Sequence, residues 1–264
     1  MLIFHGGGEM YFDTHAHYED KRFNDDRDEL LSSMPGAGIS HVLNCGCSIR
    51  SSKFGLGLAD KYPFIYASVG VHPHDAKDMT DDTVFELEKL LSHPKAAAVG
   101  EIGLDYHYDF SPRDVQGLRF REQLELARRF KKPVIIHMRE ATRDTLDIVS
   151  EFRDLTVVFH CFPGSWETAK ILLDMGWYLS FTGVITFDNA RKALEVVEKM
   201  PIDRLMLETD CPYMTPEPMR GKRNSSLFLP YIAGKVAQIR GIPVEEVAAV
   251  TTENGRRFFG VEAG

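Results

Sequence analysis

Six residues with metal-binding side chains end or follow short apolar segments that are spread along the chain. They are four histidines and two carboxylates: His15, His17, Glu101, His137, His160 and Asp210. Imidazole nitrogens and carboxylate oxygens are common ligands of divalent cations such as Zn²⁺ and Mn²⁺. Burying so many of these groups together without a cation would carry a large desolvation cost. The residue types and positions therefore predict a metal centre of the kind that activates water for hydrolysis.

The spacing of His15 and His17 fits one shared ion. Side chains alternate along a strand, so residues two apart point to the same side. Asp13 has the same parity, and we expect it to orient one of the imidazoles. Cys161 and Cys211 each adjoin a candidate ligand, so the same alternation turns their thiols away from the metals and into packing.

Eight short apolar segments, rich in Val, Ile and Phe, have the character of strands buried on both faces. We expect these strands over residues 10–15, 41–45, 64–69, 97–102, 133–138, 156–161, 177–181 and 204–209. Residues 119–130 and 189–200 carry apolar side chains at helical spacing, and 244–259 predicts a final helix. This alternation predicts a single-domain (β/α)8 TIM barrel. A doubly wound open sheet is the alternative, but the sequence lacks the Gly-rich phosphate loop typical of it.

In a (β/α)8 barrel the carboxyl ends of all strands meet at one face, where active sites lie. The candidate ligands end or follow the first, fourth, fifth, sixth and eighth predicted strands, so we expect them to converge there. Residues 1–9 include three consecutive glycines and are expected to form a flexible leader. The barrel is then expected to span residues 10–264.

Composition narrows the class of protein. The 264 residues include 31 Lys and Arg against 39 Asp and Glu, a net charge of −8. This charge argues against a protein that coats nucleic acid, but it leaves room for a nuclease with a local basic group. The four cysteines form no CxxC pair, and no apolar stretch approaches the length of a membrane span. We expect a cytoplasmic protein with reduced thiols, no membrane association and no obligate protein partner.

Motifs along nearly the whole chain resemble the TatD-type metal-dependent deoxyribonucleases of the amidohydrolase superfamily. They are FDTHAH at 12–17, GVHPH at 70–74, GEIGLDY at 100–106, PVIIH at 133–137, HCF at 160–162, SFTG at 180–183, ETDCPY at 208–213 and RGKRN at 220–224. Two positions depart from the family pattern. Pro163 stands where the family usually has Ser, and Ser226 where Pro is common. We expect both to line the substrate cleft and to affect substrate preference.

The resemblance implies two divalent ions per chain, with Mg²⁺, Mn²⁺ and Zn²⁺ as candidates. It assigns one ion to His15, His17 and Asp210, a second to His137 and His160, and a bridging position to Glu101. It also implies cleavage of DNA phosphodiester bonds from the 3′ ends of single strands. We expect Glu101 and Asp210 to be catalytic, with Asp210 as the general base.

Further residues are expected to contact substrate or support the ligands. His72, after the third predicted strand, is a candidate to touch the scissile phosphate or assist the leaving group, and a loop-stabilising role is the alternative. Arg139 follows His137, and we expect it to contact phosphate. A basic group of Arg220, Lys222 and Arg223 follows the last strand, where such barrels often bind phosphate; a solvated loop is the alternative. Asp105 is expected to hold a histidine near the metals.

Two other functions remain open at this stage. The first is an amidase, lactonase or deaminase of the same superfamily, acting on a small molecule. Many amidases of this group bridge their metals with a modified Lys, whereas Glu101 occupies that position here, which favours the nuclease. The second is a barrel that keeps metals as a scaffold or sensor without catalysis.

Overall fold

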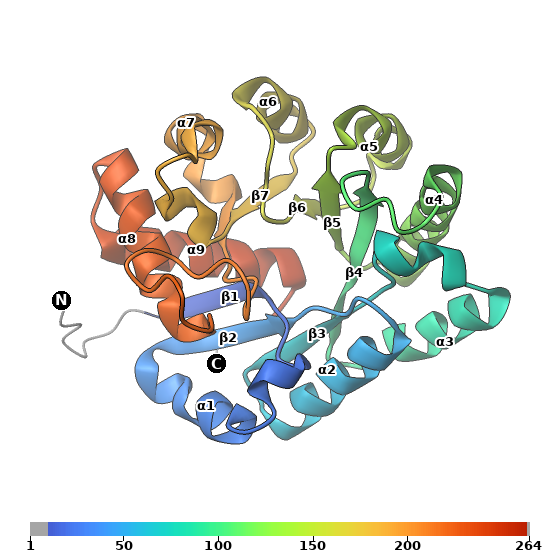
Figure 1. Cartoon of the computed structure of the whole chain (residues 1–264), viewed down its shortest axis with the longest axis horizontal. Coiled ribbons are helices and arrows are strands. Elements are labelled where there is room, and N and C mark those ends of the chain that lie inside the picture. Colours follow the sequence, from blue (N-terminus) through green and yellow to red (C-terminus); the bar gives the residue numbers. More distant parts are fainter. Residues whose placement is uncertain (1–9, 263–264) are drawn as a thin grey trace.

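The computed structural model describes residues 10–262, and over this range it forms a nearly closed (β/α)8 barrel, as predicted. The strands form one parallel sheet in chain order, and the helices lie outside it (Figure 1). The strands are β1 (Tyr11–Ala16), β2 (Ile39–Asn44), β3 (Ile65–Val69), β4 (Ala96–Asp105), β5 (Val134–Arg139), β6 (Val157–Phe159), β7 (Tyr178–Phe181) and β8 (Leu205–Leu207). The predicted leader at 1–9 lies outside the described residues.

The helices follow the strands in the expected alternation. They are α1 (Arg27–Ser33), α2 (Ile49–Lys61), α3 (Asp81–Leu91), α4 (Arg113–Phe130), α5 (Thr142–Val149), α6 (Trp166–Asp174), α7 (Arg191–Lys199), α8 (Leu229–Arg240) and α9 (Val244–Phe259). The prediction for α9 is confirmed at both ends, whereas α4 starts before its predicted start at residue 119. Short 3₁₀ segments, among them η3 (Pro73–Asp78) and η7 (Ser226–Phe228), lie in the connections.

Strand β4 differs from its prediction in a way that matters for the site. It continues to Asp105, so Glu101 lies inside the strand and the expectation that Glu101 ends it is wrong. The pairing of β4 with β5 shifts register between Val99 and Ile102. Gly103 has φ +139°, and a Cβ there would lie 2.0 Å from the carbonyl oxygen of His137. Only glycine allows this approach, which brings β4 against β5 beside the site.

The barrel is completed by the segment that follows β8. The Asp210 amide donates to the carbonyl of His15 at 2.9 Å, and the His17 amide donates to the carbonyl of Cys211 at 2.8 Å. Thr14 Oγ1 also donates to the carbonyl of Leu207 at 3.0 Å. These bonds place His15 of β1 and His17, which follows the strand, directly beside Asp210.

Two apolar cores hold the strands. The larger one lies between the sheet and the surrounding helices. The smaller one combines side chains from β1, β2, β4, β5, β6, β7 and β8 with Phe258 and Phe259 of α9, which confirms that these two residues pack inward. Within residues 10–262, no helix is both long and apolar enough to cross a membrane.

Candidate metal centre

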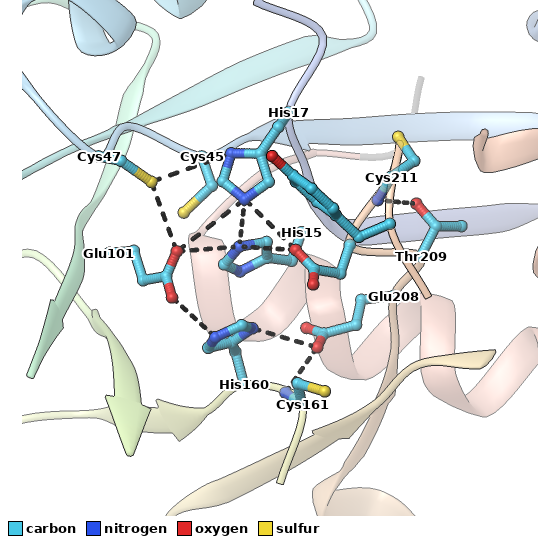
Figure 2. A network of polar contacts seen from close by, with 12 residues as sticks. His15, His17, Cys45, Cys47, Glu101, His160, Cys161, Glu208, Thr209 and Cys211 are labelled. Atoms are coloured by element: carbon cyan, nitrogen blue, oxygen red, sulfur yellow. Dashed lines mark hydrogen bonds and ion pairs between the residues drawn. The ribbon is translucent and has the colours of Figure 1, made fainter. Parts of the chain in front are cut away.

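The first group of predicted ligands comes together at the carboxyl ends of the strands (Figure 2). Nε2 of His15 and Nε2 of His17 lie 3.0 Å apart. The former is 3.4 Å from Oε2 of Glu101, and the latter is 3.4 Å from Oδ1 of Asp210. A cation bound tetrahedrally at about 2.0–2.2 Å from its ligands places neighbouring ligand atoms about 3.3–3.6 Å apart. The spacing of these four atoms fits one shared cation.

The second group surrounds the other oxygen of Glu101. Oε1 lies 2.8 Å from Nδ1 of His137 and 2.8 Å from Nε2 of His160. These two nitrogens are 3.3 Å apart. Each oxygen of Glu101 therefore faces a different pair of histidines, as a bridging ligand would.

The buried imidazoles show further signs of a ligand function. The rings of His15 and His160 stack at 4.1 Å with an interplanar angle of 15°. Nδ1 of His15 is buried without a hydrogen-bond partner among the described residues. Asp210 adopts φ +52°, a conformation that non-glycine residues take mainly where the structure demands it.

Comparison with known proteins agrees with this geometry. The family model described as TatD related DNase matches residues 12–260. The chain belongs to the TatD family. It is 42% identical to YabD of Bacillus subtilis, named an uncharacterized metal-dependent hydrolase, over 95% of this chain and 99% of that protein.

Two more relatives extend the comparison. The chain is 35% identical to a protein of Erwinia tasmaniensis named 3′-5′ ssDNA/RNA exonuclease TatD, over 94% of this chain and 99% of the relative. A crystal structure of YjjV, a TatD homologue from Escherichia coli, superposes with a TM-score of 0.89 at 29% identity. The superposition covers 96% of this chain and 98% of YjjV. This TatD-family chain is therefore a metal-dependent hydrolase.

Two carboxylates lie next to the ring nitrogens of His137 and His160 that face away from Glu101. Oδ2 of Asp105 lies 3.0 Å from Nε2 of His137 and 2.9 Å from Nε2 of His74, in agreement with its expected role. Glu208 was not predicted from the sequence. Its Oε1 lies 3.4 Å from Nδ1 of His160, and Figure 2 shows it beside that ring. Its position in the Glu-Thr-Asp motif, two residues before Asp210, was the available signal.

Asp13 differs from its prediction. Its Oδ1 accepts from the backbone amides of Thr209, at 2.9 Å, and His15, at 3.4 Å. Its Oδ2 accepts from the hydroxyls of Thr209 and Ser226, each at 2.6 Å. Among the described residues these bonds go to backbone and hydroxyl groups, so Asp13 holds β1 against the residues after β8 and does not orient an imidazole.

The cysteines are free thiols, as expected, and Cys47, for which the sequence analysis made no prediction, lies beside the site. Sγ of Cys47 is 3.5 Å from Oε2 of Glu101 and 3.9 Å from Nδ1 of His17. Burial raises the pKa of Cys47 to about 12, so the neutral thiol is the stable form beside the carboxylate. Its position after β2 is the same signal that identified the other ligands.

The metal centre combines an ionised carboxyl group with a neutral imidazole. Burial opposes ionisation of Glu101, but His160 and the hydrogen bond from His137 outweigh it and hold the pKa of this carboxyl well below its usual range. Burial lowers the pKa of His72 to about 4, so that ring is neutral near pH 7. Nδ1 of His72 accepts from the His74 amide at 3.2 Å, which leaves the ring proton on Nε2, 3.4 Å from Oε1 of Glu101.

The predicted phosphate contacts fall into two groups. Arg223 forms a two-pronged ion pair with Asp26, at 2.8 and 2.6 Å, and this pairing occupies its guanidinium. Arg220 and Lys222 are exposed, and the guanidinium of Arg220 lies 4.2 Å over the ring of Phe187 and 4.0 Å from Glu217. The guanidinium of Arg139 lies over a tyrosine ring at 4.8 Å.

The two departures from the family pattern lie in different places. Pro163 lines a mostly apolar cavity of about 510 Å³ beside Cys161 and Phe162, and the lining of this cavity includes none of the six predicted metal ligands, so a position in the substrate cleft stays a prediction. Ser226 is fully buried and bonds to Asp13 and Tyr18, so the expectation that it lines the cleft is wrong. The amide of Ser226 donates to the Tyr18 hydroxyl at 2.9 Å, a bond that a proline could not form.

Proposed function

We propose that this chain is a two-metal nuclease that hydrolyses single-stranded DNA from its 3′ end. The observation that carries the proposal is Glu101, whose two oxygens each face a separate pair of imidazole nitrogens. Similarity to proteins named 3′-5′ ssDNA/RNA exonuclease supports the substrate class. The free cysteines suit a reducing cytoplasmic setting.

The proposed ligand sets follow the two clusters. One cation would be held by His15, His17 and Asp210, the other by His137 and His160, with Glu101 shared between them. Mg²⁺, Mn²⁺ and Zn²⁺ are the candidates for this mixture of imidazole and carboxylate. Such a pair of cations supplies a lowered pKa for the attacking water and stabilisation of charge on the phosphate oxygens.

The remaining steps belong to side chains of the protein. Burial opposes ionisation of Asp210, but contacts with His17 and His15 lower its pKa, so it is a carboxylate able to accept the proton of the attacking water. His72 is neutral and carries its proton on Nε2, which points into the site. It is therefore placed to donate to a phosphate oxygen or to the leaving oxygen. Arg139, Arg220 and Lys222 are proposed to hold the phosphate backbone.

The direct test supplies the metal-free protein with end-labelled single-stranded DNA and each of the three metals in turn. We expect shortening from the 3′ end with at least one metal, and a loss of at least about 100-fold in Glu101→Ala and His137→Ala. Duplex DNA, RNA and a small carboxylic ester are run in parallel. Hydrolysis of the ester without cleavage of any oligonucleotide would replace the proposal with the small-molecule alternative. Cleavage that persists in both variants would overturn the metal roles.

A further inference from the structure

An exposed aromatic pair lies in residues 106–112, between β4 and α4. Tyr108 and Phe110 are 48% and 55% exposed, and their rings lie 5.3 Å apart at an angle of 26°. Of the other exposed aromatic residues, Phe54 and Phe85 lie on the outer helices α2 and α3, and Tyr213, which is 47% exposed, has the guanidinium of Arg22 over its ring at 4.2 Å. Tyr108 and Phe110 instead belong to a loop at the carboxyl-end face of the barrel, where the metal centre opens.

This pair connects to the metal centre through one imidazole. The ring of His74 lies 5.3 Å from Tyr108 and 4.9 Å from Phe110, with edge-to-face geometry in both contacts. On its other side, Nε2 of His74 bonds to Asp105, which also bonds to His137. A group that lies on the aromatic pair is thus separated from His137, a proposed metal ligand, by His74 and Asp105.

The loop is held in place by hydrogen bonds. The amide of Tyr108 donates to Oδ1 of Asp105 at 2.9 Å, and Nζ of Lys77 donates to the carbonyl of Phe110 at 3.0 Å. The guanidinium of Arg139 lies 4.8 Å from the centre of the Tyr108 ring. Two cations therefore border the exposed rings, which suits a ligand with flat aromatic groups joined by anionic links.

We propose that Tyr108 and Phe110 form a stacking subsite for a nucleobase of a single-stranded nucleic acid. The proposal rests on the nuclease function above and adds the part of the surface that reads the bases. Stacking on a protein ring requires a base whose faces are free, and a duplex covers those faces with neighbouring bases. Phe110 is the more exposed ring and would receive the base, with Tyr108 behind it.

The test removes the rings and the bases separately. Binding of labelled oligothymidylate and of an abasic strand of equal length is measured by fluorescence anisotropy on metal-free protein, so that no cleavage intervenes. The proteins are wild type, the double variant Tyr108→Ala/Phe110→Ala, and Phe85→Ala as a control for loss of an exposed ring elsewhere. Wild type should prefer the base-bearing strand by about 5- to 150-fold per stacked base. The preference should fall towards one in the double variant and persist in Phe85→Ala.

The remaining outcomes separate this subsite from the nuclease proposal. Cleavage of DNA by wild type, together with an undiminished base preference in the double variant, would overturn the subsite alone. Base-dependent binding that needs both rings, without cleavage under any metal, would support the subsite and overturn the nuclease. A Tyr108→Leu/Phe110→Leu variant with an unchanged melting temperature guards against misfolding. Retention of the full preference by this variant would overturn stacking in favour of a plain apolar contact.

Discussion

At the scale of single residues, Asp105 orients two imidazoles. Oδ1 accepts the backbone amides of His107 and Tyr108, at 3.0 and 2.9 Å, and Oδ2 faces His74 and His137. Since Nε2 of His137 donates to this carboxylate, Nδ1, which lies 2.8 Å from Glu101, is the nitrogen that would give up its proton and bind the cation.

We therefore predict that Asp105→Asn weakens metal binding about 10- to 100-fold. The asparagine oxygen would stay with the two amides and turn its NH₂ group towards His137. The imidazole would then accept at Nε2 and carry its proton on Nδ1, the atom that must bind the cation. Metal affinity from chelator competition measures the effect, and an unchanged circular dichroism spectrum shows that the barrel is intact. Wild-type affinity in this variant would refute the tautomer argument.

Glu208 is the corresponding group for His160. It is almost fully buried, and its oxygens accept from the Cys161 amide and the Ser180 hydroxyl, each at 2.6 Å. In Glu208→Gln, one carboxylate oxygen becomes an NH₂ group, which then faces the Cys161 amide or the Ser180 hydroxyl, both of which are donors. The side chain must turn to avoid this contact, and it then loses its contact with His160. We expect kcat and metal affinity to fall together by about 10- to 100-fold. Ser180→Ala is the matched control, since it removes one of these bonds but keeps the carboxylate, and it should cost less than Glu208→Gln.

At the scale of elements, the approach of β4 to β5 depends on Gly103. Gly103→Ala would drive a methyl group into the carbonyl of His137 at a φ that alanine rarely adopts. We predict a loss of more than about 3 kcal/mol in the free energy of unfolding, measured by urea titration. Gly57→Ala is the control, because that glycine lies in α2 with no atom within 4 Å of the added Cβ. It should stabilise the chain by about 0.4–1 kcal/mol, and equal effects of the two substitutions would contradict this account.

The basic segment after β8 divides into binding and structural residues. Arg220 and Lys222 are exposed, and the contact of Arg220 with Glu217 is long at 4.0 Å, whereas Arg223 is held by two short bonds to Asp26. In Arg220→Ala/Lys222→Ala, the slope of log affinity for single-stranded DNA against log salt should become shallower by about 1.4, or about 0.7 per contact. Arg223→Ala should leave that slope unchanged and lower the melting temperature. The reverse pattern would show that Arg223 is the phosphate contact.

The same elements show how far the sequence predicts this site. Continuous apolar runs located every strand, because each strand is buried on both faces. They could not show that β4 runs on to Asp105, since the register shift near Gly100 depends on packing against β5. Cys47 and Glu208 each had a positional signal, after β2 and in the Glu-Thr-Asp motif, but no local pattern shows which side chains they contact. The contacts that bring them to the site are with residues 28 or more positions away in the chain.

At the scale of the whole molecule, the site and the apolar cores are separate. The ligands cluster at one end of the barrel, while packing of the strands against the helices and α9 supplies the cores. The fold should therefore survive removal of metal, because hydrophobic burial rather than coordination holds the strands together.

We predict that chelation abolishes hydrolysis but leaves the far-ultraviolet circular dichroism spectrum and cooperative unfolding intact. Returning metal at about 100 times its Kd should raise the melting temperature by about 5–10 °C, since a ligand that binds only the folded state stabilises it by mass action. The double variant His15→Ala/His137→Ala, which loses one ligand from each cluster, should fold but show no such rise. Unfolding on chelation would mean that the carboxyl end of the barrel is assembled by the cations, and the separation of site from core would then be wrong.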